Sequence, residues 1–108
     1  MQRLLTPILL SLALAAVGSA QAEATSELGR KVFVQIAQPP CAICHTLKDA
    51  ESIGEIGPAL DDLKPDAARV AAAVRNGVGV MPPYEGKLTD EQIEAVAAYV
   101  AQATGAAK

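Results

Sequence analysis

Two cysteines and the single histidine of this 108-residue chain stand together as Cys41-Ala42-Ile43-Cys44-His45. Two thiols three positions apart can add across the two vinyl groups of one haem, and the adjacent histidine can then supply an axial nitrogen to the iron. This C-x-x-C-H pattern is typical of covalent c-type haem attachment. The chain has no other cysteine or histidine. We therefore expect one haem c bound through Cys41 and Cys44, with His45 as an iron ligand.

Three other uses of the motif are open on spacing alone. A C-x-x-C pair can be a thioredoxin-like redox site, but that site needs a strand–helix context, and a proline-rich stretch precedes Cys41. A structural zinc ion needs four ligands, and two thiols with one imidazole leave the set one short. A simple disulfide between Cys41 and Cys44 also fits the spacing.

A haem iron with one histidine ligand either takes a sixth ligand or keeps an open site. Met81 is the only methionine besides Met1, and it lies 36 residues after His45, next to Pro82 and Pro83. A thioether sulfur is soft, suits ferrous iron and raises the reduction potential. We expect His45 and Met81 to be the two metal ligands. The alternative is that Met81 only fills a gap in the core.

Residues 1–22 are typical of a secretory signal peptide. Arg3 gives a positive start, residues 4–17 are almost continuously apolar, and Ala20-Gln21-Ala22 is an A-x-A cleavage site. The apolar run is shorter than the roughly 20 residues that a membrane span needs, although an uncleaved amino-terminal anchor is an alternative. We expect the signal to be removed, leaving a domain of residues 23–108 that is periplasmic and does not span the membrane.

The composition favours one small domain completed by a cofactor. One Phe, two Tyr and no Trp leave Ala, Val, Leu and Ile to fill the core, and a chain this short builds only a marginal core. Removal of Arg3 with the signal leaves 8 basic against 12 acidic residues, a formal charge of −4. No basic run or aromatic–basic pattern points to nucleic acid as a partner.

The hydrophobic pattern predicts three helices joined by long loops. The first covers residues 27–37, is capped by Ser26 or Thr25 and ends before two prolines. The second covers residues 66–76, has Pro65 in its first turn and stops at a glycine. The third has the clearest start, because Thr89-Asp90-Glu91-Gln92 forms a capping box.

Between these helices the pattern is less regular. We expect a turn of helix over residues 41–47, an irregular loop over residues 49–62 without strands, and a second loop over residues 77–87. Loops of this length are uncommon in small domains unless they surround a functional site. The fold class we predict is therefore all-α, with three to four helices wrapped around one covalently attached haem.

Four motifs in this order resemble those of class I c-type cytochromes, the small monohaem electron carriers. They are the C-x-x-C-H pentad, Gly57-Pro58-Ala59-Leu60, Gly79-Val80-Met81-Pro82 and Ala97-Ala98-Tyr99-Val100. The resemblance implies the small cytochrome c fold and one-electron transfer without bond chemistry, so the protein would not be an enzyme. It also implies that the Pro58 carbonyl accepts a hydrogen bond from the ligand histidine. The alternative interpretation is that Pro58 only interrupts regular structure in a loop.

The same resemblance implies a contact between the first and last helices, with Gly29 and Phe33 on one and Tyr99 on the other. Ordinary core packing would also account for the two aromatic residues. The chain lacks the lysine-rich face of eukaryotic-type cytochromes c, so their basic docking surface does not carry over.

A narrower resemblance concerns the partner. The stretches 54–58, 63–66 and 76–82 are similar to the cytochrome subunit of bacterial sulfite dehydrogenases, which takes electrons from a molybdenum-containing subunit. The partners expected are thus redox proteins: an electron-donor dehydrogenase, such as a sulfite-oxidising molybdenum enzyme, and a downstream acceptor. The competing hypothesis is a haem-based sensor of small ligands or a peroxidase-like site with an open sixth position. It would need a distal acid–base group, and no second histidine is present.

Overall fold

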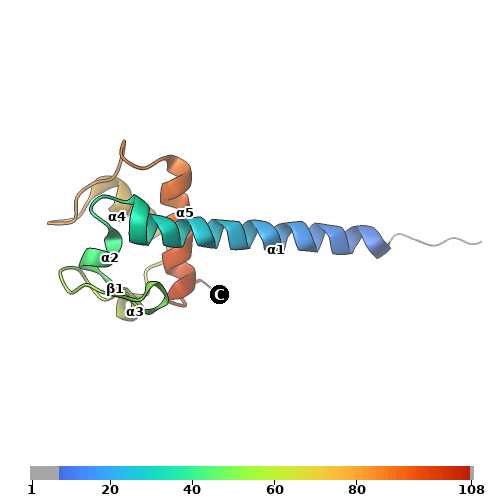
Figure 1. Cartoon of the computed structure of the whole chain (residues 1–108), viewed down its shortest axis with the longest axis horizontal. Helices are drawn as coiled ribbons and strands as arrows, with labels where there is room; N and C mark the ends of the chain where they lie inside the picture. Colours follow the sequence, from blue (N-terminus) through green and yellow to red (C-terminus); the bar gives the residue numbers. More distant parts are fainter. Residues whose placement is uncertain (1–7, 108) are drawn as a thin grey trace, which may run out of the picture.

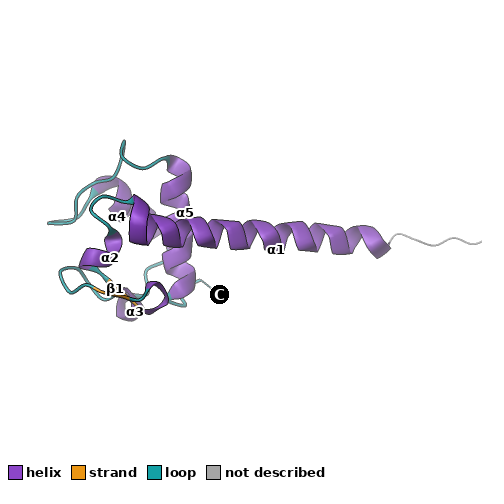
Figure 2. Cartoon of the chain, viewed as in Figure 1, coloured by secondary structure: helices purple, strands orange, loops and turns teal. Residues whose placement is uncertain are grey.

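The computed structural model describes residues 8–107, and the side chains of residues 18–107. Within this range, helices and turns dominate, and they are linked by long loops (Figure 2). The elements are α1 Ile8–Lys31, the π-helical turn η1 Val32–Ile36, α2 Cys41–Cys44, β1 Thr46–Leu47, the 3-10 turn η2 Lys48–Ala50, β2 Ser52–Ile53, α3 Leu60–Leu63, α4 Ala67–Asn76 and α5 Asp90–Ala103. The predicted all-α class is confirmed. The longer helices α1, α4 and α5 form the framework, α2 and α3 are single turns, and the two strands have only two residues each.

Helix α1 begins far earlier than expected. It starts at Ile8 instead of Glu27, so Ser26 and Thr25 lie inside the helix and cap nothing. The preceding residues are rich in Ala and Leu, which are strong helix formers, and a residue suited to a cap does not by itself stop a helix. The amino-terminal half of α1 projects away from the globular part of the molecule (Figure 1).

The predicted signal peptide falls partly on residues 1–7, which lie outside the described residues, and partly on this projecting segment. The side chains of residues 18–25 are exposed, so they add nothing to the hydrophobic core. Among the described residues, no helix combines the length and apolar character needed to cross a membrane.

The carboxyl-terminal end of α1 crosses α5 at a glycine. A Cβ on Gly29 would collide with the Ala95 carbonyl and with the Tyr99 side chain, so only glycine permits this close approach. One turn later, Phe33 and Tyr99 meet edge to face, with ring centroids 6.2 Å apart. The helix crossing expected from the family resemblance is therefore present, and it fixes η1 and the start of the next segment against α5.

The segment after α2 is more ordered than predicted. Strands β1 and β2 pair antiparallel, with Thr46 opposite Ile53 and Leu47 opposite Ser52, and α3 follows them. The expectation of an irregular loop without strands is wrong here. Two-residue strands are too short to show alternation in a sequence. The turn between them places Glu51 at φ 55°, a left-handed conformation that nothing in the sequence indicates.

Helices α4 and α5 have side-chain caps. Asp66 accepts a hydrogen bond from the Arg69 N–H at 2.8 Å, so Asp66 is the cap of α4. The first turn begins at Ala67, so Pro65 precedes the cap and lies outside the first turn in which it was expected. Thr89 and Gln92 form both bonds of the predicted capping box at the start of α5. The two helices pack side by side, and α5 contributes more buried residues than any other element.

Candidate cofactor site

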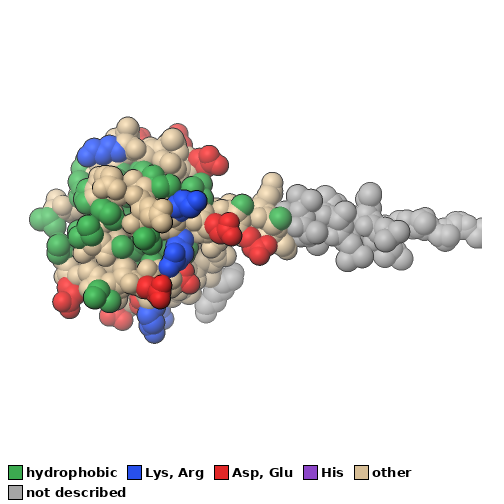
Figure 3. Space-filling model, viewed as in Figure 1, with side chains coloured by type: hydrophobic (Ala, Val, Ile, Leu, Met, Phe, Trp, Pro, Cys, Tyr) green, Lys and Arg blue, Asp and Glu red, His purple; other side chains and the backbone are tan. Residues whose placement is uncertain are grey.

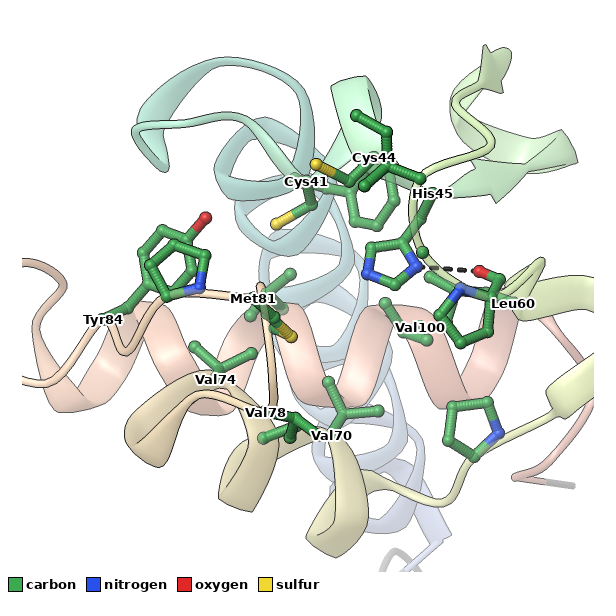
Figure 4. A pocket seen from close by; sticks show the side chains of 18 of the residues that line it. Cys41, Cys44, His45, Leu60, Val70, Val74, Val78, Met81, Tyr84 and Val100 are labelled. Carbon is green, nitrogen blue, oxygen red and sulfur yellow. Dashed lines mark hydrogen bonds between the residues drawn. The ribbon is translucent and has the colours of Figure 1, made fainter.

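A cavity of about 510 Å³ lies between α2, α4, α5 and the loop that carries Met81. This volume falls in the roughly 300–1,000 Å³ range of small-molecule and cofactor sites. Aliphatic and aromatic side chains form most of its wall, including Phe33, Leu60, Val70, Val74, Val96 and Val100. The structure places all five residues proposed from the sequence on this one cavity: Cys41, Cys44, His45, Pro58 and Met81 (Figure 4).

The single turn of α2 brings the two cysteines to the same side. Residues three apart on a helix are neighbours on its surface, so Cys41 and Cys44 both reach the cavity from above in Figure 4. Both thiols are free and partly buried. Burial, reinforced by the neighbouring Cys44, raises the pKa of the Cys41 thiol to about 11. The helix ends at Cys44, and at His45 the backbone is extended and the imidazole faces the cavity.

His45 is oriented by a carbonyl group. Its Nδ1 lies 2.8 Å from the Pro58 carbonyl oxygen, and because a carbonyl only accepts hydrogen bonds, Nδ1 must carry the proton. The other ring nitrogen, Nε2, then keeps its lone pair and is available to a metal. A ligand histidine held in this way has a fixed tautomer and a more basic free nitrogen.

Two glycines that sequence reasoning did not single out for this role bring the loop onto the motif. A Cβ on Gly57 would lie 2.5 Å from His45 Cε1, and a Cβ on Gly54 would collide with the Ile43 carbonyl. The Gly57 N–H also donates to the Cys44 carbonyl at 2.7 Å. Their signal in the sequence was the spacing Gly-x-x-Gly-Pro, which entered the family resemblances without a packing role for either glycine.

Met81 lies on a tight loop on the other side of the cavity. Val78 and Met81 exchange two backbone hydrogen bonds of 3.0 and 2.9 Å, which close a turn around Gly79 at φ 56°. The Met81 side chain is partly buried against the hydrophobic core. In contrast, Val78 and Val80 are 64% and 86% exposed. The loop therefore directs the thioether inward, and the two valines lie at the exposed edge of the cavity that they help to line.

Tyr84 is a third residue that the sequence did not mark as functional. Its side chain is 4% exposed and lines the cavity three residues after Met81. Its hydroxyl donates to the Pro39 carbonyl at 2.6 Å. Burial, followed by the nearby thiols of Cys41 and Cys44, raises the pKa of Tyr84 to about 12. The only sequence signal was a lone aromatic residue after a proline pair.

The residues of the cavity fit haem c. Two thiols on one face of a helical turn can form the two thioether bonds, an imidazole and a thioether can supply axial ligands, and apolar walls can enclose a macrocycle. Among the described residues, no cluster of three or more His, Cys, Asp or Glu side chains is placed to hold a bare metal ion. The donor set matches an iron porphyrin, with the cysteines serving as attachment points.

Comparison with known proteins gives a consistent result. The family model described as cytochrome c oxidase, cbb3-type, subunit III matches residues 24–100. Cytochrome c6 of Leptolyngbya boryana is 37% identical over 86 residues, which cover 71% of this chain and 91% of that protein. Cytochrome c6 of Nostoc sp. strain PCC 7120 is 35% identical over 115 residues, covering 93% and 92%.

Among solved structures, the c-type cytochrome SorU from Sinorhizobium meliloti is similar to this chain. The two share 58% sequence identity and superpose with a TM-score of 0.74, covering 77% of this chain and 94% of SorU.

Proposed function

This chain belongs to the class I monohaem c-type cytochromes, in the family described as cytochrome c oxidase, cbb3-type, subunit III, and we propose that it carries single electrons in the bacterial periplasm on a haem ligated by His45 and Met81. Its relatives are electron carriers and not enzymes, and its cofactor is haem c, attached covalently at the Cys41/Cys44 motif. We propose the two iron ligands, the periplasmic location and the redox partners in the paragraphs that follow.

One observation carries this proposal. Four groups that suit haem attachment and ligation, at positions 41, 44, 45 and 81, converge on one apolar cavity from two separate parts of the chain. The bound haem supplies one-electron chemistry at its iron. The chain's residues attach it, orient His45 through Pro58, and exclude water with the valines of α4 and α5. A histidine–methionine pair in an apolar site favours the reduced iron and a high potential.

The location rests on the amino-terminal sequence. We propose that residues 1–22 direct export and are cleaved after Ala22, which leaves the domain of residues 23–108. The exposure of the side chains of residues 18–22 supports this, because removing these five residues costs no core contact. Amino-terminal sequencing of the protein recovered from the periplasmic fraction tests the site, and we expect it to begin at Glu23. A mature protein beginning at Met1 would contradict both cleavage and the domain boundary.

Covalent attachment has a direct chemical test. The mass of the exported protein should exceed that of the mature chain by one haem, and extraction with acidified acetone should leave the colour in the protein. Replacement of Cys44 by Ser should leave one thioether bond at best and lower the yield of holoprotein. Colour that passes entirely into the solvent would contradict covalent attachment.

The partner is proposed from charge and from the exposed residues around the cavity. The mature chain carries a formal charge of −4, so a donor with positive charge near its own redox centre would be steered toward it. Exposed apolar side chains at the cavity, Ile56, Val78 and Val80, offer a small surface for docking. Figure 3 shows hydrophobic side chains exposed on the surface of the globular part, with charged side chains scattered among them. A carrier that must dissociate after each electron suits an interface of small area.

The first candidate donor is a sulfite-oxidising molybdenum enzyme, which the resemblance of residues 54–58, 63–66 and 76–82 supports. The test is stopped-flow reduction of the oxidised protein by such an enzyme with sulfite, over a range of ionic strength. We expect fast reduction that slows as salt is added. Slow reduction that salt does not change would reject electrostatic steering. If no reduction occurs, the donor is not a sulfite-oxidising enzyme, and a general carrier role remains.

A further inference from the structure

Tyr84 connects two chain segments that meet at the cavity. One is the Met81 loop, which Tyr84 follows by three residues, and the other is the proline segment that leads into Cys41. The Tyr84 hydroxyl donates to the Pro39 carbonyl at 2.6 Å, and its backbone N–H donates to the Val74 carbonyl at 2.7 Å. The side chain is 4% exposed, so both bonds are formed largely out of water.

The Met81 loop has few other attachments. The backbone hydrogen bonds of Val78 and Met81 run within the loop itself, and its tip carries Val80, which is 86% exposed. Gly77 and Gly79 have positive φ angles of 75° and 56°, conformations that glycine adopts at little cost. After Met81, Tyr84 is the first residue that is hydrogen-bonded to the rest of the protein.

We propose that Tyr84 is a positioning residue for Met81, in which the hydroxyl bond to Pro39 holds the loop closed so that the thioether stays at the iron. This inference rests on the proposed role of Met81 as the sixth ligand. The bond joins the segment that precedes the attachment cysteine to the segment that follows the axial methionine. Haem attachment on one side and methionine ligation on the other are thereby linked by one side chain.

The chain offers a matched control, because it contains only two tyrosines and each donates one hydroxyl hydrogen bond. Tyr84 bonds to Pro39 beside the cavity, whereas Tyr99 bonds to Asp49 Oδ2 at 2.5 Å. Both side chains are buried, at 4% and 3% exposure. Replacement of either by Phe removes one hydroxyl and keeps the ring, and Tyr84→Phe also keeps the backbone bond to Val74.

The experiment titrates the oxidised holoprotein with imidazole, which competes with the methionine for the sixth position. The readout is loss of the weak red charge-transfer band of the iron–thioether bond. If the bond to Pro39 holds the loop closed, Tyr84→Phe should raise the population of open loop and tighten the apparent imidazole affinity by about three- to tenfold, the range expected for loss of one hydrogen bond. Tyr99→Phe should bind imidazole as the wild type does.

The outcomes separate this inference from the function on which it rests. If the wild type shows the band and both variants titrate alike, Tyr84 does not position Met81, although Met81 remains the ligand. If the wild type lacks the band, the ligand assignment fails and the inference fails with it. Denaturant unfolding of both variants provides the second readout. A purely structural role for Tyr84 would lower the unfolding midpoint without a selective change in imidazole affinity.

Discussion

The two walls of the cavity that carry the proposed iron ligands are built differently. On the His45 side, the ring nitrogen bonds to Pro58 at 2.8 Å, the His45 carbonyl accepts from Ser52 Oγ at 2.9 Å, and a backbone bond of 2.7 Å joins Gly57 to Cys44. On the Met81 side, the loop is bonded to itself and then to the protein through Tyr84. One ligand is held by several independent contacts, and the other by few.

The difference indicates that the two sides of the cavity have different functions. The His45 side contains the attachment site, so its rigidity should determine whether the haem is incorporated and how it is oriented. The Met81 side closes the cavity, so its contacts should determine how firmly the sixth position is kept and how high the potential lies. Variants on the two sides should therefore fail in different ways, and each prediction below tests that difference.

The largest effect should come from removal of the ligands themselves. His45→Ala should abolish most of the holoprotein, because it removes the axial nitrogen next to an attachment cysteine. Met81→Ala should keep the covalent haem but lower the potential and let small ligands bind. Haem content per chain and potentiometric titration measure both effects. Equal loss of haem in the two variants would contradict the proposed difference between the two sides.

The next effect compares two glycines. Gly57→Ala would place a Cβ 2.5 Å from His45 Cε1, and forcing that ring to move should cost about 1–3 kcal/mol in the free energy of unfolding. Gly79→Ala meets no atom within 4 Å but must adopt φ 56°, which should cost roughly 1–2 kcal/mol.

Denaturant unfolding of the holoproteins measures both free-energy costs. The absorption spectrum, recorded with and without imidazole, shows which side of the cavity each substitution disturbs. We expect Gly57→Ala to disturb the histidine side and leave imidazole affinity unchanged, whereas Gly79→Ala should tighten imidazole binding. The reverse pattern would show that the two walls do not act independently.

A smaller effect should depend on pH through Tyr99, whose hydroxyl supports the segment after β1. Burial, followed by the hydrogen bond to Asp49, raises the pKa of Tyr99 above its ordinary value of 10.0. A raised folded-state pKa stabilises the protein below the unfolded-state value, and this contribution is lost as the pH rises through the folded-state value. The unfolding free energy of the wild type should therefore fall above pH 10, and that of Tyr99→Phe should fall less. Parallel curves would contradict the prediction.

The smallest effect should come from Thr89→Ala, which removes the side-chain cap at the start of α5. Loss of such a cap costs about 1 kcal/mol. Because Thr89 does not line the cavity, we expect the unfolding midpoint to fall while haem content and imidazole affinity stay unchanged. A selective change in either property would mean that α5 acts on one wall more than on the other.

The sequence predicted best where a few residue types determine the outcome. The attachment motif and the capping box at Thr89 were readable because local chemistry determines them, whereas the helix crossing at Gly29 was expected from the family resemblance. The all-α class followed from the helical spacing of apolar residues. The close approach of Gly57 to His45 was missed, since it depends on the path of a loop that carries no periodic signal.

Other differences have the same origin. The short β1–β2 pair is a local hairpin that sets Thr46 opposite Ile53 and Leu47 opposite Ser52, and strands of two residues are too short to show alternation in a sequence. The early start of α1 reflects strong helix formers before Ser26 and Thr25, the residues at which a cap was expected. Tyr84 was overlooked because its partner, the Pro39 carbonyl, lies 45 positions away in the sequence.

The most direct test of the central claim is the absorption spectrum of the oxidised protein, recorded for the wild type and for Met81→Ala. We predict a low-spin iron with the weak red band of an iron–thioether bond in the wild type, and loss of that band together with binding of small ligands in the variant. An unchanged spectrum in Met81→Ala would show that the sixth ligand is another group, for which Lys64 and Lys87 are the candidates, and would contradict histidine–methionine ligation.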